Sequence, residues 1–252
     1  MELFVLLMIF IMGTIFGSFF NVVGYRLPKG ESIVYPPSHC PKCKRNLKPL
    51  ELIPIISWLF QKGTCKNCKQ KIGLFYPIFE FITGAMFVLN YIVFGPTLEF
   101  GLGLIFISSL IIIIISDYQT MIIPDEIIIL TILSMVVYSF ISKDTNVFII
   151  SLNGFISGAI MFSIKTFGDH LFKKESMGGG DIKLLFVFGM YLGFELAIIT
   201  IFLSSFLALP YSIYVVKVKK SNIVPYGPFL AIAAAFLFLI QTDFLTIITI
   251  LA

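Results

Sequence analysis

The stretch "GLIFISSLIIIIISDYQTMIIPDEIIILTILSM", residues 103–135, places two long apolar runs on either side of a short segment that contains aspartate and proline. A helix needs about 20 predominantly apolar residues to cross the hydrocarbon core of a bilayer. With their flanking residues, the two runs predict membrane-spanning helices at residues 98–116 and 126–142. Pro124 disfavours helical backbone at the residue before it, so it separates these helices just ahead of Asp125.

The same apolar character extends over the whole chain of 252 residues. Hydrophobic residues make up 58% of it and charged residues 13%, and the mean hydropathy is +0.99. These values exclude an ordinary soluble globular domain. The sequence therefore predicts an all-α polytopic membrane protein with about eight transmembrane helices, at residues 4–24, 77–95, 98–116, 126–142, 147–167, 182–194, 195–216 and 228–250.

Lys and Arg residues are distributed unevenly over the loops between these helices. With the N-terminus outside the cell, the loops 25–76, 165–183 and 217–222 face the cytoplasm, and they hold every Lys and Arg except Lys143. Cytoplasmic loops of membrane proteins carry such an excess of basic residues. We therefore expect a multi-pass protein of the cytoplasmic membrane, surrounded by membrane lipids. The same rule accounts for the net charge of +4, so we predict no nucleic-acid partner.

All four cysteines lie in the first of these loops, as "CPKC" (Cys40 and Cys43) and "CKNC" (Cys65 and Cys68). Two C-x-x-C pairs separated by about 20 residues are typical of a tetrahedral zinc site, because each pair turns tightly and points both thiolates at one ion. Lysines beside the pairs favour the thiolate form. Since cysteine fills all four positions, no site is left for a water molecule, and the predicted Zn²⁺ is structural.

Two disulfides are the alternative interpretation of these cysteines. The predicted place of the loop in the reducing cytoplasm disfavours it, because stable disulfides are rare there. Between the two pairs, the apolar stretch "LKPLELIPIISWLFQKG", residues 47–63, is broken by proline. We expect this stretch to rest on the membrane surface, with Trp58 as an interfacial anchor.

Three carboxylates stand at the cytoplasmic ends of predicted spans: Asp117, Asp125 and Asp181. Charged residues beside membrane spans are costly, so each is a candidate functional residue. Two carboxylates in contact share one proton. The charged member can then take a proton from water while the protonated member donates one to a scissile carbonyl. Since the three lie at one membrane face, an aspartyl peptidase dyad is one interpretation of them.

The sequence "SMGGGDIKLL", residues 176–185, surrounds Asp181 with features that suit such a site. Glycine allows positive φ and the close approach of another backbone, and the unpaired N–H groups at a helix start stabilise an anion. The alternative is purely structural, because aspartate is a common helix cap and a glycine run is a common loop. The spacing leaves open whether Asp117 or Asp125 is the partner of Asp181.

Six motifs follow one another along nearly the whole chain: "GSFFNVVGYRLP" (residues 17–28), the paired "CPKC" and "CKNC", "YPIFE" (76–80), "DYQTMIIPD" (117–125), "MGGGD" with "IKLL" (177–185) and "PYGPFLAIAA" (225–234). In this order they resemble the type IV prepilin peptidases, a family of bifunctional leader peptidases and N-methyltransferases that are integral-membrane aspartyl proteases of bacteria. A single motif would be a weak match, whereas six in the family's order are specific.

The resemblance implies which aspartates act and on what. The family's catalytic positions fall on Asp117 and Asp181, which leaves Asp125 a supporting role. One departure is Gln119, where many members carry an acidic residue. The implied substrate is a prepilin or pseudopilin with a short basic leader, cut at the cytoplasmic face after a glycine. Many members then methylate the new N-terminal residue with S-adenosylmethionine, an activity that the family associates with the cysteine loop; this cofactor rests on resemblance alone.

Five further residues are candidates for supporting roles: Gly178, Gly180, Lys183, Glu80 and Asn21. The two glycines belong to the motif before Asp181. Lys183 either holds its charge at the interface by snorkelling or biases the proton of the dyad. Glu80 lies within a span, where burial favours its neutral form or a partner such as Lys or Arg.

Asn21 lies on the first helix in a stripe with Gly13, Gly17 and Gly24, since residues three or four apart share a helix face. Such small residues let another helix pack closely, and packing is our main interpretation of the stripe. Asn21 could instead form a hydrogen bond with a carboxylate or with the substrate backbone.

The predicted organisation is a first transmembrane helix at residues 1–24, a cytoplasmic zinc-binding loop at 25–76 and a transmembrane aspartyl peptidase core at 77–252. Two other functions are alternatives. A membrane transporter could use the carboxylates as a proton or ion relay with the cysteine loop as a zinc sensor, but it would need acidic residues near mid-span. A scaffold whose zinc loop docks secretion partners would tolerate the loss of any aspartate.

Overall fold

Helices form nearly all of the regular structure in the computed structural model, which describes residues 2–142, 145–175, 177–220 and 224–240. Within these ranges there is no β-strand, only two isolated β-bridges in the cysteine loop. The α-helices there are α1 (Glu2–Arg26), α2 (Ile56–Phe60), α3 (Phe75–Phe94), α4 (Leu98–Thr120), α5 (Asp125–Ile141), α6 (Val147–Phe172), α7 (Gly179–Leu192), α8 (Phe194–Tyr214) and α9 (Gly227–Ile240). The predicted all-α fold is confirmed.

Five of the described helical stretches are long and apolar enough to cross a membrane: Glu2–Lys29, Phe75–Phe94, Leu98–Thr120, Val147–Phe172 and Phe194–Val218. The chain is therefore a polytopic membrane protein. The other three predicted spans coincide with α5, α7 and α9, which have 17, 14 and 14 residues in the described part of the chain. The count of eight spans stays a prediction. The end of the span predicted at 228–250, beyond Ile240, lies outside the described residues, as does Lys143.

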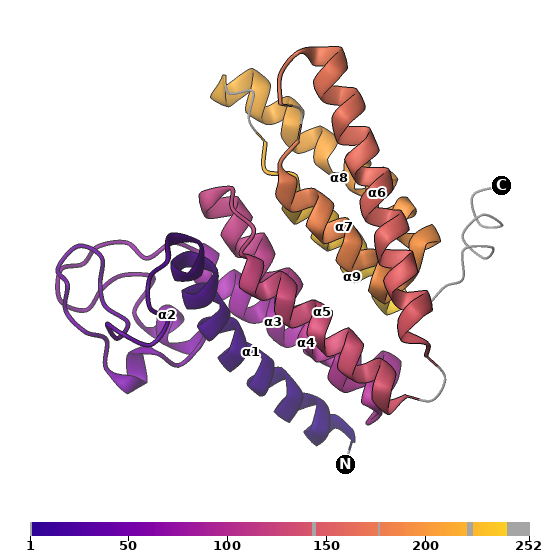
Figure 1. Cartoon of the computed structure of the whole chain (residues 1–252). Helices are drawn as coiled ribbons and strands as arrows, with labels where there is room; N and C mark the ends of the chain where they lie inside the picture. The colour runs from indigo at the N-terminus through magenta and orange to yellow at the C-terminus, as the bar shows by residue number, and fades with distance from the viewer. Residues whose placement is uncertain (1, 143–144, 176, 221–223, 241–252) are drawn as a thin grey trace. The chain divides into compact units, whose positions relative to one another are not determined.

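The chain divides into two units, Met1–Ile115 and Ser116–Ala252, and each is described by itself. In the first unit α1 packs along α3 (Figure 1). A Cβ atom added at Gly13 would lie 2.7 Å from the Cα of Gly84, and one added at Gly17 would lie 2.9 Å from the Cα of Glu80. The glycine stripe on the first helix therefore lets two membrane helices approach backbone to backbone.

The segment that joins α1 to α3 forms a separate lobe beside the long helices of the first unit (Figure 1). This cysteine lobe, residues 27–74, contains 3₁₀ turns at Leu27–Lys29 and Pro49–Glu51 and the short helix α2. Because the lobe follows the end of α1 and precedes the start of α3, it lies at the same end of both helices.

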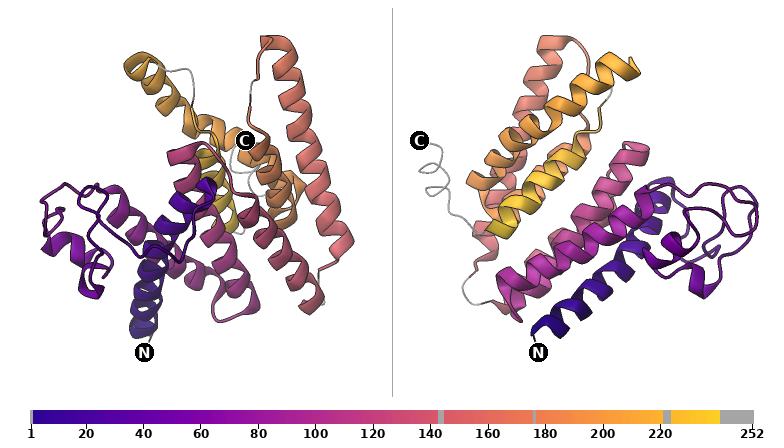
Figure 2. Two further views of the ribbon diagram at one scale, coloured as in Figure 1. Left: turned by 60° about the vertical axis from the view of Figure 1, so that its left-hand side comes forward. Right: turned by 180° about the vertical axis from the view of Figure 1, so that it is seen from behind.

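In the second unit, α7 is the central helix and packs against α5, α6, α8 and α9. Its Leu185 and Phe188 side chains are completely buried. Figure 2 shows α9, in yellow, beside the orange α8. Hydroxyl groups add to the packing: Tyr191 on α7 shares a hydrogen bond of 2.6 Å with Ser134 on α5. The span predicted at 182–194 is thus a short helix packed among four others, and this packing fixes where its first residues lie.

Candidate active site

Asp117 lies one turn before the end of α4, because the helix continues to Thr120 instead of stopping at residue 116. The residue is only 6% exposed. After the helix the chain turns at Met121, which has a φ of 56°, and the Ser116 hydroxyl donates a hydrogen bond of 2.5 Å to the carbonyl oxygen of Ile122. The linker between α4 and α5 is therefore folded back against the last turn that carries Asp117.

Asp181 is the third residue of α7 and is 7% exposed. The glycine run before it does not form a loop as a whole, since α7 begins at Gly179 with Gly178 as its N-cap. The Asp181 N–H donates to the Gly178 carbonyl oxygen at 3.3 Å. Asp117 and Asp181 lie close enough for their charges to interact. Two buried carboxylates from α4 and α7 therefore share one site in the second unit.

The space around this pair is limited by Ile123, in the linker before α5. A Cβ atom at Gly180 would lie 2.9 Å from the Cδ1 of Ile123, and one at Gly227 would lie 3.4 Å from the same atom. By contrast, a Cβ atom at Gly179 would meet nothing within 4 Å. Of these glycines, Gly180 and Gly227 are the two for which even a methyl group has no ordinary room.

Gly227, the first residue of α9, contacts Asp117 directly. Its N–H forms a hydrogen bond with the Asp117 carboxylate, and a Cβ atom in its place would lie 2.8 Å from Asp117 Oδ2. The neighbouring Tyr226 is anchored to α8, where its hydroxyl lies 2.6 Å from Ser204 Oγ. Sequence reasoning did not single out Gly227 or Tyr226 as site residues. The sequence feature that could have indicated them is their place in the motif "PYGPFLAIAA". The spacing of residues along the chain does not tell which helix start lies beside which carboxylate.

Asp125 and Lys183 form a different kind of pair. The Lys183 Nζ lies 2.5 Å from Asp125 Oδ1, and the side chains are 50% and 62% exposed. Lys183 therefore has an ion-pair partner in addition to the possibility of snorkelling. Of the three carboxylates predicted to converge, two are buried together and the third is exposed and paired with a cation.

Glu80 and Asn21 lie in the first unit, and each has backbone partners. The Glu80 carboxylate accepts a hydrogen bond of 2.7 Å from the N–H of Ile55, which leads into α2, and it is also hydrogen bonded to Ser18 on α1. Of the two alternatives for Glu80, the neutral form and a Lys or Arg partner, these uncharged partners do not supply the second. Asn21 donates to the carbonyl oxygens of Gly17 and Tyr76, at 3.1 and 3.3 Å. Both side chains tie α1 and α3 together near the cysteine lobe.

The two C-x-x-C pairs in the cysteine lobe adopt the same backbone conformation. The Cys40 N–H donates to the Arg45 carbonyl oxygen at 3.0 Å, and the Cys65 N–H donates to the Gln70 carbonyl oxygen at 2.9 Å. The lysine after each pair has a φ of 56°. Each pair is enclosed by an isolated β-bridge at the same position, between the residue before the first cysteine and the third residue after the second. The two halves of the site are therefore structural repeats, each of which turns its cysteines toward the other half.

The four sulfur atoms lie within 4.8 Å of one another and could hold a metal ion. The Sγ atoms of Cys40 and Cys68 are 3.7 Å apart. Tetrahedral zinc with Zn–S bonds of about 2.3 Å separates its sulfur ligands by about 3.8 Å. Hydrogen bonds from the backbone N–H groups of Cys68 and Asn67 lower the pKa of the Cys65 thiol to about 6. The donor set, the distances and the thiolate-favouring N–H groups fit a tetrahedral thiolate-bound metal.

Arg45 and Glu51 brace one half of this site. Arg45 Nη2 lies 2.8 Å from Glu51 Oε1, and Glu51 Oε2 accepts the Lys48 N–H at 2.9 Å. The hydrogen bond from the Arg45 guanidinium, aided by the Lys48 N–H, lowers the pKa of the Glu51 carboxyl to about 2. Arg45 is also hydrogen bonded to the Cys65 sulfur. The ion pair thus connects the 3₁₀ turn Pro49–Glu51 to the cysteines.

Comparison with known proteins finds two matching family descriptions. Residues 11–94 match the "Bacterial Peptidase A24 N-terminal domain", and residues 104–213 match the "Type IV leader peptidase family". The four cysteines fall in the first match and both buried aspartates in the second. Gly227 lies beyond the residues that either match covers.

Several curated proteins are similar to most of this chain. One from Bacillus subtilis (strain 168), named "Prepilin leader peptidase/N-methyltransferase", is 36% identical over 88% of this chain and 89% of its own length. Proteins of the same name from Klebsiella pneumoniae and Dichelobacter nodosus are 32% and 31% identical, over 78% and 88% of this chain and 89% and 87% of their own lengths. No solved structure matches the chain.

Proposed function

The chain belongs to the type IV leader peptidase family, and from this premise we propose that it cleaves the leaders of type IV prepilins or pseudopilins with Asp117 and Asp181 as the catalytic pair. Because its relatives are named for both activities, we also propose that it N-methylates the newly exposed N-terminal residue. The observation that carries the peptidase proposal is the burial of two aspartates, from α4 and α7, within range of each other's charge.

The proposed reaction uses the two carboxylates in different protonation states. Burial and mutual repulsion disfavour two charges at one site, so the pair holds one proton. An N–H donor stabilises a carboxylate over the acid, and Asp117 receives such a bond from Gly227. We therefore assign Asp117 as the base that takes a proton from the attacking water. Asp181 donates its proton to the oxygen of the scissile carbonyl as the water oxygen bonds to the carbonyl carbon. When the C–N bond of the tetrahedral intermediate breaks, Asp117 passes the proton it took from water to the leaving nitrogen, which becomes the mature N-terminus, and Asp181 recovers a proton from a hydroxyl of the intermediate.

Gly227, Gly180 and Gly178 are proposed to position this pair. The Gly227 N–H donates a hydrogen bond to the Asp117 carboxylate. The hydrogen bonds of the neighbouring Tyr226 hydroxyl to α8 fix the position of this N–H. Gly180 allows Ile123 to pack against the first turn of α7. Gly178, the N-cap residue before α7, has extended backbone, and a Cβ atom there would lie 3.9 Å from Asp181 Oδ2. A displacement of about 1 Å can cost a catalytic site about 100-fold in rate.

Four of the remaining site residues are proposed to support the site without touching the reacting atoms. Asp125 and Lys183 link the start of α5 to the first turn of α7 by their exposed ion pair. Glu80 and Asn21 hold α1, α3 and the segment before α2 in place through backbone hydrogen bonds. Their contribution is expected to be smaller than that of the buried aspartates.

The cofactors follow the same division of the chain. We propose that Cys40, Cys43, Cys65 and Cys68 bind a structural Zn²⁺, because four thiolates leave no open coordination position. S-adenosylmethionine is the proposed methyl donor, on the names of the relatives alone.

We also propose the organisation predicted from the sequence, with the first transmembrane helix at 1–24, the zinc-binding loop at 25–76 and the peptidase core at 77–252. We also keep the orientation with the N-terminus outside and the active site facing the cytoplasm, supported by the distribution of Lys and Arg.

The relatives described above carry peptidase and methyltransferase names, which give no support to the transporter alternative. The positions of the aspartates are also unsuited to a relay across the membrane, since Asp117 lies in the last turns of α4 and Asp181 in the first turn of α7.

A cleavage assay in liposomes with a prepilin substrate tests the proposal. Asp117→Asn and Asp181→Asn each keep the shape of the side chain and remove the carboxylate, so each should abolish cleavage while the protein stays folded. Asp125→Asn is the matched control, because it changes the third aspartate of the same region and should retain most of the activity. Retained cleavage in either of the first two variants, or complete loss in Asp125→Asn alone, would overturn the assignment.

A further inference from the structure

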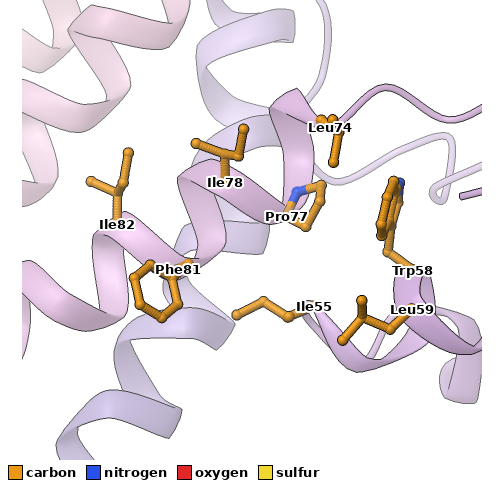
Figure 3. Close-up of a pocket in the computed structure, with 8 residues that line it drawn as sticks. All are labelled: Ile55, Trp58, Leu59, Leu74, Pro77, Ile78, Phe81 and Ile82. Carbon is orange, nitrogen blue, oxygen red and sulfur yellow. The ribbon is translucent and has the colours of Figure 1, made fainter.

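A cavity of about 300 Å³ lies between the segment around α2 and the first turns of α3 (Figure 3). Every side chain that lines it is apolar apart from the indole N–H of Trp58. We call it the interfacial groove; it is lined by Ile55, Trp58, Leu59, Leu74, Pro77, Ile78, Phe81 and Ile82.

The polar groups next to the groove are hydrogen bonded to residues outside its lining. Trp58 Nε1 donates to the Ile72 carbonyl oxygen at 3.1 Å, and the Ile55 N–H donates to Glu80 at 2.7 Å. An occupant of the groove therefore meets hydrocarbon and aromatic surface without an offered hydrogen bond. Such a site selects an apolar ligand, because a polar one would lose its hydrogen bonds to water.

The mouth of the groove continues onto surface that belongs to the membrane. Leu59, Ile78 and Phe81 are 60%, 48% and 54% exposed. Two of them lie on α3, which is long and apolar enough to span the bilayer. Large exposed apolar patches on proteins mark interaction or membrane sites. At the end of a membrane-spanning helix, the molecules that cover this face are lipid chains.

The apolar lining of the groove suits an acyl chain, which can enter it and leave its remaining length in the bilayer.

Charge beside the groove indicates which lipid it selects. A second cavity of about 330 Å³ in the same lobe is lined by Arg45, Lys48 and Lys66, together with Leu50, Glu51 and Asn67. Its single carboxylate, Glu51, already forms an ion pair with Arg45 at 2.8 Å. This leaves the lining with a positive charge. The turn Pro49–Glu51, which supplies part of the lining, packs against α2, which supplies part of the interfacial groove.

We propose that the interfacial groove binds an acyl chain of an anionic phospholipid whose headgroup is attracted by the cation-lined cavity next to it. The lipid is taken from the membrane leaflet that surrounds the start of α3. A lipid bound in this way has one end in the groove and the rest in the bilayer. It therefore keeps the segment around α2, and with it the cysteine lobe, beside the membrane. This inference needs only that the chain spans a membrane, so it does not depend on the proposed peptidase activity.

Trp58 offers a direct test, because it is the only tryptophan in the chain and it lines the groove. The full-length, metal-loaded protein is reconstituted in phosphatidylcholine vesicles that contain a minor fraction of phosphatidylglycerol. In one sample only the phosphatidylglycerol chains carry bromine, and in the other an equal amount of phosphatidylcholine does. Bromine quenches indole fluorescence on contact. We expect roughly fivefold or more preference for the anionic lipid, since each Lys or Arg near a surface contributes about that factor.

Two sets of variants locate the effect. Ile78→Asn places a polar group in the groove and should remove most of the quenching. Ile92→Asn, at a position near the other end of α3 that is 61% exposed against 48% for Ile78, should leave the quenching unchanged. Lys48→Gln with Lys66→Gln should keep quenching by both lipids but abolish the preference. Unchanged Trp58 emission in lipid without bromine, together with unchanged metal content, shows that a variant has kept the lobe folded.

Three outcomes would overturn the proposal. Absence of quenching by either brominated lipid means that no chain enters the groove. Equal quenching by the two lipids refutes the selection of an anionic headgroup. Equal quenching in the wild type and in Ile78→Asn means that the brominated chains reach Trp58 from outside the groove.

Discussion

The buried aspartate pair and the four-cysteine cluster bring distant residues together in different ways. Asp117, near the end of α4, and Asp181, in the first turn of α7, are buried within range of each other's charge, and the Gly227 N–H at the start of α9 completes their surroundings. The cysteines are placed by two local turns of the same shape, each closed by hydrogen bonds within a few residues. A site built by helix packing should be sensitive to single methyl groups, whereas a site built by local turns should be sensitive mainly to loss of its ligands.

Removal of a cysteine is expected to have the largest effect on stability. Cys40→Ser leaves three thiolates, and structural zinc contributes about 10 kcal/mol or more to the folding of small domains. We expect loss of bound metal and protease cleavage within residues 27–74. Metal analysis and limited proteolysis of the purified protein measure both. His39→Ala is the matched control, because the neighbouring histidine is outside the cluster and should keep the metal.

This change also tests the contrast between the regions, because the aspartate pair belongs to the other unit of the chain. Cleavage of a prepilin in detergent by Cys40→Ser should therefore be reduced much less than metal binding. If metal loss and complete loss of cleavage always occur together, the two sites are not independent and the comparison fails.

Gly180→Ala is expected to have the next largest effect. The added Cβ atom would meet the Cδ1 of Ile123 at 2.9 Å and its Cβ at 3.2 Å, so the Ile123 side chain must rotate and the linker or α7 must shift by a few tenths of an ångström. A shift of this size beside the aspartates predicts a loss of cleavage of about tenfold, less than the loss of about 100-fold that a shift of about 1 Å costs. Gly179→Ala adds the same methyl group one residue earlier, where it meets nothing within 4 Å, and should retain activity. Initial rates of cleavage at saturating substrate compare the two, and equal rates would refute the claim that packing at Gly180 positions the site.

Glu51→Gln tests the brace of the cysteine lobe. The carboxylate accepts hydrogen bonds from Arg45 and from the Lys48 N–H, and losing its charge should cost about 1–3 kcal/mol. The folded-state pKa of Glu51 is lowered from 4.5 to about 2. Its stabilisation is therefore complete above pH 4.5 and is lost only as the pH falls through about 2.

Because the pKa of Glu51 is lowered, its contribution to stability can be measured between pH 7 and pH 5, without the strong acid that would also remove the metal. Denaturant unfolding followed by Trp58 fluorescence should show the same difference between wild type and Glu51→Gln at pH 7 and at pH 5. A difference that shrinks over this interval would contradict the low pKa. Glu31→Gln, at an exposed position in the same lobe, should change stability little at either pH.

The smallest effect is expected for the ion pair of Asp125 and Lys183. Both side chains are at least half exposed, and such pairs contribute about 0–1 kcal/mol. Single changes, Asp125→Asn or Lys183→Met, should alter the cleavage rate by less than about fivefold, and the double variant should be no worse than the sum of the two. A loss comparable to that of Gly180→Ala would show that this pair acts on the substrate directly.

Much of the fold could be predicted from the sequence, because membrane helices are encoded locally. The apolar runs gave the helices α1, α3, α4, α5, α6 and α8 to within a few residues, apart from the longer C-terminal ends of α4 and α6. The four cysteines were recognisable as one cluster from their spacing, since each C-x-x-C turn depends on few residues. In each case the physical signal lies within one segment of the chain.

The details of the site could not be predicted in the same way. Spacing did not choose between Asp117 and Asp125, and it left open whether Glu80 is neutral or has a charged partner, whereas the structure places the Ile55 N–H and Ser18 beside it. Gly227 was visible only as part of a motif, although its N–H reaches Asp117. These contacts join residues far apart in the sequence. The donors of Ile55 and Gly227 are backbone N–H groups, which every residue except proline possesses, so the residue type does not reveal them.

The sequence by itself determined that this is an all-α membrane protein, that four thiols gather in one lobe and that aspartates stand at helix ends. Hydrophobicity, charge and short turns act over one helix or one loop, so they can be read along the chain. Only the tertiary structure decided which aspartates are buried together and which glycine leaves room for a carboxylate. That choice depends on contacts between residues far apart in the sequence, as at Gly180 and Gly227, where a single added methyl group would lie less than 3 Å from its neighbour.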